Sequence, residues 1–144
     1  MIYADTSFLF PLILHDVNTA AAKAYLKRHK ESLILTPWQR YELRNAVRLS
    51  VWRANCPPPL AKGALEQIDA DIAAGSFSAT AIDWTDIMER AEGLSGQHTT
   101  TAGVRSLDLF HIASAISLKV KAFLTFDARQ FVAAKAAGLN ARIL

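Results

Sequence analysis

The sequence predicts an α/β fold with a mostly parallel sheet, because short apolar segments alternate with longer helical segments along the whole chain. No internal repeat, linker or low-complexity stretch interrupts this alternation. The chain has 144 residues, of which 51% are hydrophobic and 20% charged. This length and composition suit one folded domain with a single core, so we expect one domain over residues 1–144.

Five short apolar segments are expected to form the strands. In chain order they are Met1–Ala4, Leu33–Leu35, Phe77–Ile82, Ala122–Phe126 and Ala141–Leu144. The helices between them are expected over Phe8–Leu14, Asn18–Lys30, Pro37–Ala54, Pro57–Ala74, Trp84–Leu94, Ser106–Leu118 and Ala128–Ala137.

Local signals set the boundaries of these helices. Thr6 and Ser7 are expected to be the N-cap residues of the first helix, which accommodates Pro11 only in its first turn. Further caps are expected at Thr36, Asp83 and Ser106, a triple proline at 57–59 separates two helices, and Gly138 ends the last helix. The polar run 95–103 is expected to be a loop.

Composition excludes several classes of site and location. The formal net charge of +3 allows an anionic partner without requiring one. Because Cys56 is the only cysteine, a disulfide framework and a thiolate zinc cluster are excluded, and a reducing compartment is favoured. The first residues do not resemble a signal peptide, and the longest apolar run, Phe8–Leu14, is far shorter than the ~20 residues of a membrane span. We therefore expect a cytoplasmic protein without a membrane segment.

Four carboxylates are expected near the carboxyl ends of the strands, where ligands bind in open α/β sheets. Asp5 ends the first strand, Asp127 follows the fourth, and Glu42 and Asp108 lie in the first turns of helices. Taken singly, Asp127, Asp108 and Glu42 are typical of caps or solvated helix positions. Together, four converging carboxylates require neutralisation, and carboxylate and water ligands favour Mg²⁺ or Mn²⁺. Such a site is suited to phosphodiester hydrolysis.

Four segments resemble the PIN-domain family, most closely the VapC-type toxins of bacterial toxin–antitoxin pairs. They are Tyr3–Leu9 with Asp5, Tyr41–Ala46 with Glu42, Arg105–Ala115 with Asp108, and Leu124–Asp127. The resemblance implies a three-layer PIN-like domain whose sheet of about five strands is flanked by helices. It also implies an endoribonuclease that depends on Mg²⁺ or Mn²⁺, with these four acids as catalytic residues and metal ligands. A homodimer and a cognate antitoxin are further implications.

Other side chains near the four acids are candidates for contacts with RNA. The hydroxyls beside two acids, one amide and one arginine make up this set: Thr6, Asn45, Arg53 and Thr125. The arginines at 40, 44 and 48 are expected on the helix face opposite Glu42, either solvated or toward an acidic partner. His111 and the stretch 98–101 remain open between structural and functional roles. The three tryptophans are expected in core or dimer contacts.

Three alternative functions were compared with ribonuclease activity. An aspartyl phosphatase usually has a second Asp two residues after the first, where this chain has Ser7. A receiver domain needs a lysine after its last core strand, where this chain has Asp127. A non-catalytic RNA- or protein-binding module on a PIN-like fold remains the main alternative, and four intact acids argue against it.

Overall fold

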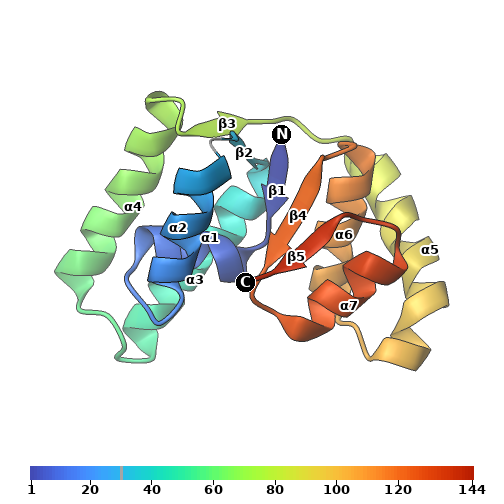
Figure 1. The fold of residues 1–144 in the computed structure, drawn as a ribbon. Coiled ribbons are helices and arrows are strands. Elements are labelled where there is room, and N and C mark those ends of the chain that lie inside the picture. The colour runs from blue at the N-terminus through green and yellow to red at the C-terminus, as the bar shows by residue number, and fades with distance from the viewer. Residues whose placement is uncertain (30) are drawn as a thin grey trace.

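The computed structural model describes residues 1–29 and 31–144. Its five strands are β1 (Ile2–Ala4), β2 (Leu33–Leu35), β3 (Phe77–Ala79), β4 (Ala122–Thr125) and β5 (Ala141–Ile143). Its helices are α1 (Thr6–Ile13), α2 (Thr19–His29), α3 (Pro37–Trp52), α4 (Pro58–Ala73), α5 (Trp84–Ala102), α6 (Ser106–Ser117) and α7 (Ala128–Ala136). The strands form one sheet in the order β3-β2-β1-β4-β5, and every pairing is parallel (Figure 1). The predicted α/β class is confirmed.

Two layers of helices cover the two faces of the sheet. Helices α1–α4 contribute to one core cluster and α5–α7 to the other, and Figure 1 shows the two groups on opposite sides of the strands. Successive strand residues alternate between the clusters, because strand side chains point to opposite faces. In β1, Ile2 and Ala4 enter the first cluster, whereas Tyr3 enters the second. All three residues are buried, as expected for a parallel strand covered on both faces.

The first helix differs from the prediction at both its cap and its proline. Asp5, rather than Thr6 or Ser7, is the N-cap of α1, and its carboxylate accepts a hydrogen bond from the Phe8 backbone N–H. The helix therefore begins two residues earlier than expected. Pro11 lies inside α1 rather than in its first turn, so the helix lacks one interior hydrogen bond and ends soon afterwards.

The predicted polar loop over residues 95–103 is wrong, because α5 continues as a helix to Ala102. Leu94 is buried in the second core cluster, and the hydroxyls of Ser95 and Thr99, one turn apart, are 3.1 Å from each other. Packing against α6 overrides the weak helix propensity of the Ser, Gly and Thr residues in this segment. The helix ends at Gly103, whose φ of 62° is the left-handed conformation that glycine adopts easily.

Three smaller boundaries also differ from the sequence prediction. β3 ends at Ala79 rather than Ile82, because its only neighbour, β2, ends at Leu35. The N-cap of α6 is Arg105 rather than Ser106, which is instead the first helical residue. The predicted end of the second helix, Lys30, lies outside the described residues. None of the helices in the described ranges has both the length and the apolar character needed to cross a membrane.

Candidate active site

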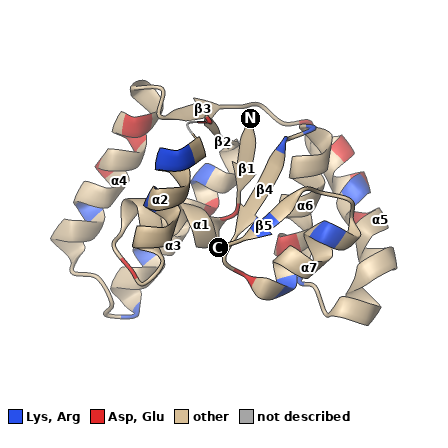
Figure 2. Cartoon of the chain, viewed as in Figure 1, with Lys and Arg blue, Asp and Glu red and all other residues tan. Residues whose placement is uncertain are grey.

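Acidic side chains lie at the edge of the sheet where the central strands end. β1 leads directly into Asp5, and its neighbour β4 leads one residue later into Asp127. Because β1 and β4 pair in parallel, both acids lie at the same edge. Figure 2 shows acidic positions where these strands pass into α1 and α7, with basic positions on the surrounding helices. Glu42 is joined to this edge by a hydrogen bond from Thr6, and Asp108 is joined to it through Arg105, which also contacts Asp127.

Asp5 is held by three hydrogen-bond donors. Its Oδ1 accepts from the Ser7 hydroxyl at 2.7 Å and from the Phe8 N–H at 3.0 Å, and its Oδ2 accepts from the Thr125 hydroxyl at 2.7 Å. The residue is only 4% exposed. Burial raises the pKa of Asp5 above its ordinary value, although the three donors and the nearby His111 act in the opposite direction. Its charged form is therefore costly until a cation neutralises it.

Thr125, at the end of β4, connects two of the acidic positions. Its hydroxyl donates to Asp5 and accepts from the Asp127 backbone N–H at 2.8 Å. Gln130 Oε1 lies 3.3 Å from the same hydroxyl and is an alternative acceptor for its single proton. Because Thr125 is fully buried, the structure gives it a positioning role for Asp5 rather than the direct RNA contact that we predicted.

Arg105 lies between the carboxylates of Asp108 and Asp127. Its Nε donates to Asp108 Oδ2 at 2.9 Å, its Nη2 is 3.3 Å from Asp108 Oδ1, and the same Nη2 is 3.6 Å from Asp127 Oδ2. The other oxygen of Asp127 accepts from two N–H groups at the start of α7 and so caps that helix. The charge of Arg105 also lowers the pKa of Glu42. A single guanidinium thus acts on three of the four predicted acids.

Glu42 is held by two side chains from other elements. His111 Nε2 lies 2.7 Å from Glu42 Oε2, and the Thr6 hydroxyl donates to the same oxygen. On the other side of the ring, His111 Nδ1 is 2.9 Å from the Tyr3 hydroxyl. Burial acts to raise the pKa of Glu42, but the hydrogen bonds and charge of its partners lower it below its ordinary value.

These contacts determine where the His111 proton resides. An ionised Glu42 only accepts hydrogen bonds, so Nε2 of His111 must carry the proton that joins them. Burial raises the pKa of Tyr3, so its hydroxyl keeps its own proton and can donate it to Nδ1. His111 is 2% exposed, whereas the sequence alone left its role open between a core position and a phosphate contact. The structure makes it a buried support for Glu42.

The four acids are suitable ligands for a hard divalent cation, but they do not form a preformed metal site. Within residues 1–29 and 31–144, no group of three or more His, Cys, Asp or Glu side chains is placed to hold a metal ion. The reason lies in the contacts: Arg105 separates Asp108 from Asp127, and the Thr125 hydroxyl intervenes between Asp5 and the start of α7. The donor set therefore fits Mg²⁺ or Mn²⁺, provided that Arg105 moves away.

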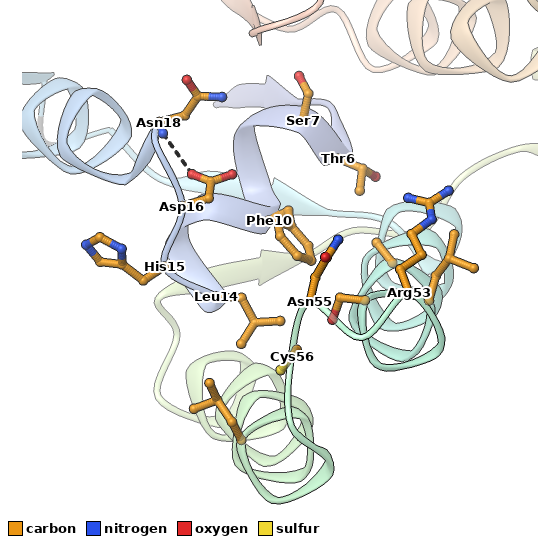
Figure 3. Close-up of a pocket in the computed structure, with 14 residues that line it drawn as sticks. Thr6, Ser7, Phe10, Leu14, His15, Asp16, Asn18, Arg53, Asn55 and Cys56 are labelled. Atoms are coloured by element: carbon orange, nitrogen blue, oxygen red, sulfur yellow. Dashed lines mark hydrogen bonds between the residues drawn. The ribbon is translucent and has the colours of Figure 1, made fainter.

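A cavity of about 550 Å³ opens beside this cluster. Thr6 and Ser7, which contact Glu42 and Asp5, form part of its wall, and Arg53 at the end of α3 forms another part (Figure 3). Arg53 is exposed, as a candidate for RNA contact must be. Asn45 is exposed as well, and among the described contacts it makes no hydrogen bond to Glu42.

Two of the other basic positions of α3 have a partner within the chain, and the third, Arg48, is exposed. Arg40 and Arg44 bind the two carboxylate oxygens of Asp69 on α4, at 2.8 Å and 3.0 Å. Arg44 also donates to the Leu65 carbonyl. These two arginines therefore connect α3 to α4, and the Arg40 side chain is also 50% exposed, as the predicted solvated face requires. The stretch 98–101 is part of α5 rather than a loop.

Sequence reasoning gave no role to Arg105 or Tyr3, which shape the site. Arg105 and Asp108 are three residues apart at the start of a helix, a spacing that predicts an ion pair. This signal was present in the sequence. The Tyr3 hydroxyl reaches His111 across 108 positions, and no local pattern indicates such a contact.

The chain was compared with protein families, curated proteins and solved structures. The PIN domain family model matches residues 2–136. No curated protein matches. One similar structure is FitAcB from Neisseria gonorrhoeae, with 20% identity, a match covering 98% of this chain and 96% of that one, and a TM-score of 0.70. Another is VapC20 from Mycobacterium tuberculosis, described as a sarcin–ricin loop cleaving toxin, with 20% identity, a match covering 96% of each chain, and a TM-score of 0.67. A third is PAE2754 from Pyrobaculum aerophilum (16% identity, 92% of this chain and 78% of that one, TM-score 0.59). At these identities the structures show a shared fold, and the family match over nearly the whole sequence shows that this chain belongs to the PIN-domain family.

Proposed function

We propose that this protein is a metal-dependent endoribonuclease and the toxin of a toxin–antitoxin pair. The observation that carries the proposal is the set of four acids, Asp5, Glu42, Asp108 and Asp127, linked by shared contacts at the carboxyl edge of a PIN-domain sheet. The similarity to VapC20, described as a sarcin–ricin loop cleaving toxin, favours RNA cleavage by a toxin.

The four acids are the proposed ligands of Mg²⁺ or Mn²⁺. When bound, such an ion supplies Lewis-acid chemistry, because it polarises a phosphodiester and makes water a stronger acid. Asp5 and Asp108 are proposed as direct ligands, with Glu42 and Asp127 acting in part through water. Thr125 and Ser7 orient Asp5, whereas His111 and Thr6 fix the carboxylate of Glu42.

Arg105 is proposed to have two successive positions. In the structure it neutralises Asp108 and Asp127, which would otherwise repel each other. A divalent cation on the same carboxylates would repel the guanidinium. Because the Arg105 side chain is 63% exposed, it can turn toward solvent, where it can donate two parallel hydrogen bonds to an RNA phosphate.

This competition predicts tighter metal binding when Arg105 is removed. In Arg105→Gln, Mn²⁺ should bind the RNA-free protein about 1.4- to fivefold more tightly, because an exposed ion pair of ~0.2–1 kcal/mol no longer has to break. RNA cleavage at saturating Mn²⁺ should nevertheless fall, because the phosphate contact is lost. Isothermal titration calorimetry measures the first effect, and a cleavage assay measures the second.

Arg90→Gln is the matched control for Arg105→Gln. It removes the same charge from an ion pair with Asp86 within α5, away from the four acids. Its Mn²⁺ affinity and its cleavage rate should equal those of the wild type. Unchanged or weaker Mn²⁺ binding in Arg105→Gln would contradict the proposed competition.

Two protein partners are part of the proposal: a second copy of the chain and a cognate antitoxin, acting in the cytoplasm. Exposed apolar side chains on α5 and α6 support a protein partner, since Met88 is 59% exposed and Leu107 52% exposed. With Trp38, Trp84 and Phe110 they line a surface cavity of about 760 Å³. Sedimentation at micromolar concentration tests the homodimer, and a clean monomer would count against it.

A cleavage assay on structured RNAs tests the proposed function. The purified protein should cut RNA in Mg²⁺ or Mn²⁺, stop in EDTA, and resume when the metal is restored. Asp5→Asn should be inactive under every condition. If the wild type binds RNA but never cuts it, the alternative function, a non-catalytic binding module on the same fold, replaces the nuclease.

A further inference from the structure

The cavity of about 550 Å³ beside the acids has the features of a ligand site. Its wall includes Thr6 and Ser7, whose hydroxyls bind Glu42 and Asp5. A molecule in the cavity would therefore lie next to the proposed site of cleavage. Its volume falls within the ~300–1,000 Å³ of typical small-ligand pockets.

The side chains that line the cavity differ from one side to the other. Figure 3 shows Arg53 near Thr6, with Asp16 and Asn18 across from them and the Phe10 ring between the two groups. Phe10 is half-buried, so part of its ring is free for contact. From one side to the other, the cavity thus presents the cation of Arg53, the aromatic ring of Phe10, and the polar groups of Asp16 and Asn18.

One carboxylate oxygen of Asp16 can accept a further hydrogen bond. Its Oδ1 accepts from the Asn18 backbone N–H at 2.8 Å and lies 3.5 Å from the Thr19 hydroxyl. Among the described residues no donor is bonded to Oδ2. Asp16 is half-buried and fixed by these contacts, so Oδ2 is a pre-oriented acceptor for an N–H group of a ligand.

We propose that this cavity binds one unpaired nucleotide of the RNA, adjacent to the bond that is cut; the proposal rests on the ribonuclease function. The base stacks on Phe10, an N–H group on its edge donates to Asp16, and its phosphate binds Arg53. The nucleotide is unpaired, because only an unstacked base can place a face on an aromatic side chain and an edge on polar groups. The cavity therefore contributes to selection of the cleavage position.

Binding of short RNAs to a non-cleaving protein tests the nucleotide site. The probes are fluorescein-labelled uridine hexamers in which each position in turn carries A, C, G, U or an abasic sugar. They are titrated by fluorescence anisotropy, in Mg²⁺, against protein carrying Asp108→Asn, so that the RNA remains intact. At one position, removal of the base should weaken binding about five- to a hundredfold, the effect expected for one base–aromatic stack.

Two substitutions in the same background separate stacking from edge recognition. Phe10→Leu keeps an apolar wall but removes the ring, so all four bases should bind at that position no better than the abasic sugar. Asp16→Asn should change the order of preference among the bases and leave the abasic probe unaffected. Phe131→Leu is the matched control, since Phe131 is another half-buried phenylalanine, on α7 in the second core cluster. It should bind every probe like the parent protein.

Photocrosslinking adds a positional measurement. A hexamer with 5-iodouridine at the sensitive position should crosslink to the peptide that contains Phe10, and Phe10→Leu should abolish the crosslink. Equal binding of base-containing and abasic probes, no binding of any probe, or a crosslink elsewhere would each overturn the nucleotide site. An apolar segment of a protein partner would then be the remaining occupant. Wild-type cleavage of RNA is measured separately, so the nucleotide site can fail while the nuclease function stands.

Discussion

Asp5→Asn is expected to melt at a higher temperature than the wild type in EDTA and at a lower temperature in Mg²⁺. Without metal, the wild type must bury a carboxylate whose pKa is raised by desolvation. Asparagine removes that cost. With metal at a hundredfold excess over Kd, the wild type gains about 2.7 kcal/mol, or roughly 8 °C for a chain of this size. The variant, which lacks a proposed direct ligand, should lose most of this gain.

The local hydrogen bonds survive this substitution. The Asn oxygen can still accept from Ser7 and from the Phe8 N–H, and Asn is as good an N-cap as Asp. The Thr125 hydroxyl can rotate its proton toward Gln130 and accept from the Asn amide instead. Melting curves of both proteins in EDTA and in Mg²⁺ provide the measurement. An equal Mg²⁺ shift in the two proteins would rule out Asp5 as a ligand.

The difference in stability between the wild type and Asp5→Asn should depend on pH, because the pKa of Asp5 is raised in the folded protein. An unfolded aspartate has a pKa of about 3.9, and burial raises the folded-state pKa above this value. Between the two values the folded protein retains a proton that the unfolded chain has lost, so the free energy of unfolding decreases as pH rises. In EDTA, the advantage of Asp5→Asn should therefore widen as pH increases from about 4 and level off above the folded-state pKa.

Glu42→Gln is expected to lower the rate of RNA cleavage at least about a hundredfold. Glutamine has nearly the same shape, and its carbonyl can still accept from His111 and Thr6, which hold the carboxylate in the wild type. The substitution therefore removes the negative charge while keeping the position. Single-turnover cleavage at saturating Mg²⁺ measures the effect.

Glu31→Gln is the control for Glu42→Gln, since it neutralises a carboxylate that pairs with Lys121 at the surface. Its cleavage rate should match that of the wild type. If Glu42→Gln cleaves at the wild-type rate, Glu42 has no part in the reaction, and its contact with His111 is structural only.

The strands and the acids at their ends could be predicted because the signals are local. A parallel strand buried on both faces is a short apolar run, and Asp5 and Asp127 follow two such runs directly. Because parallel strands share a carboxyl edge, both acids could be placed on the same side of the sheet, whereas the pairing of β1 with β4 that brings them close could not be predicted. The contact between His111 and Glu42 joins residues 69 positions apart, and it depends on how α3 and α6 are oriented across the edge.

The second half of α5 could not be predicted from its own residues. Ser, Gly and Thr have weak helix propensity, so the run from Ser95 was indistinguishable from a loop. Its helical conformation comes from packing against α6, a later segment of the chain. Pro11 was misplaced for a related reason, since the cap at Asp5 starts α1 earlier and brings the proline into the helix.

The pairing of β1 with β4 has a consequence for the newly synthesised protein. Asp5 leaves the ribosome well before the hydroxyl that orients it, which belongs to Thr125, 120 positions later. At ~5–20 residues per second, the chain spends several seconds with its first acid made and its last acid not yet translated. Until Asp127 is made, the chain lacks one of the four acids that we propose as metal ligands. Under the proposed function, cleavage and the need for an antitoxin therefore begin only after Thr125 and Asp127 have been translated.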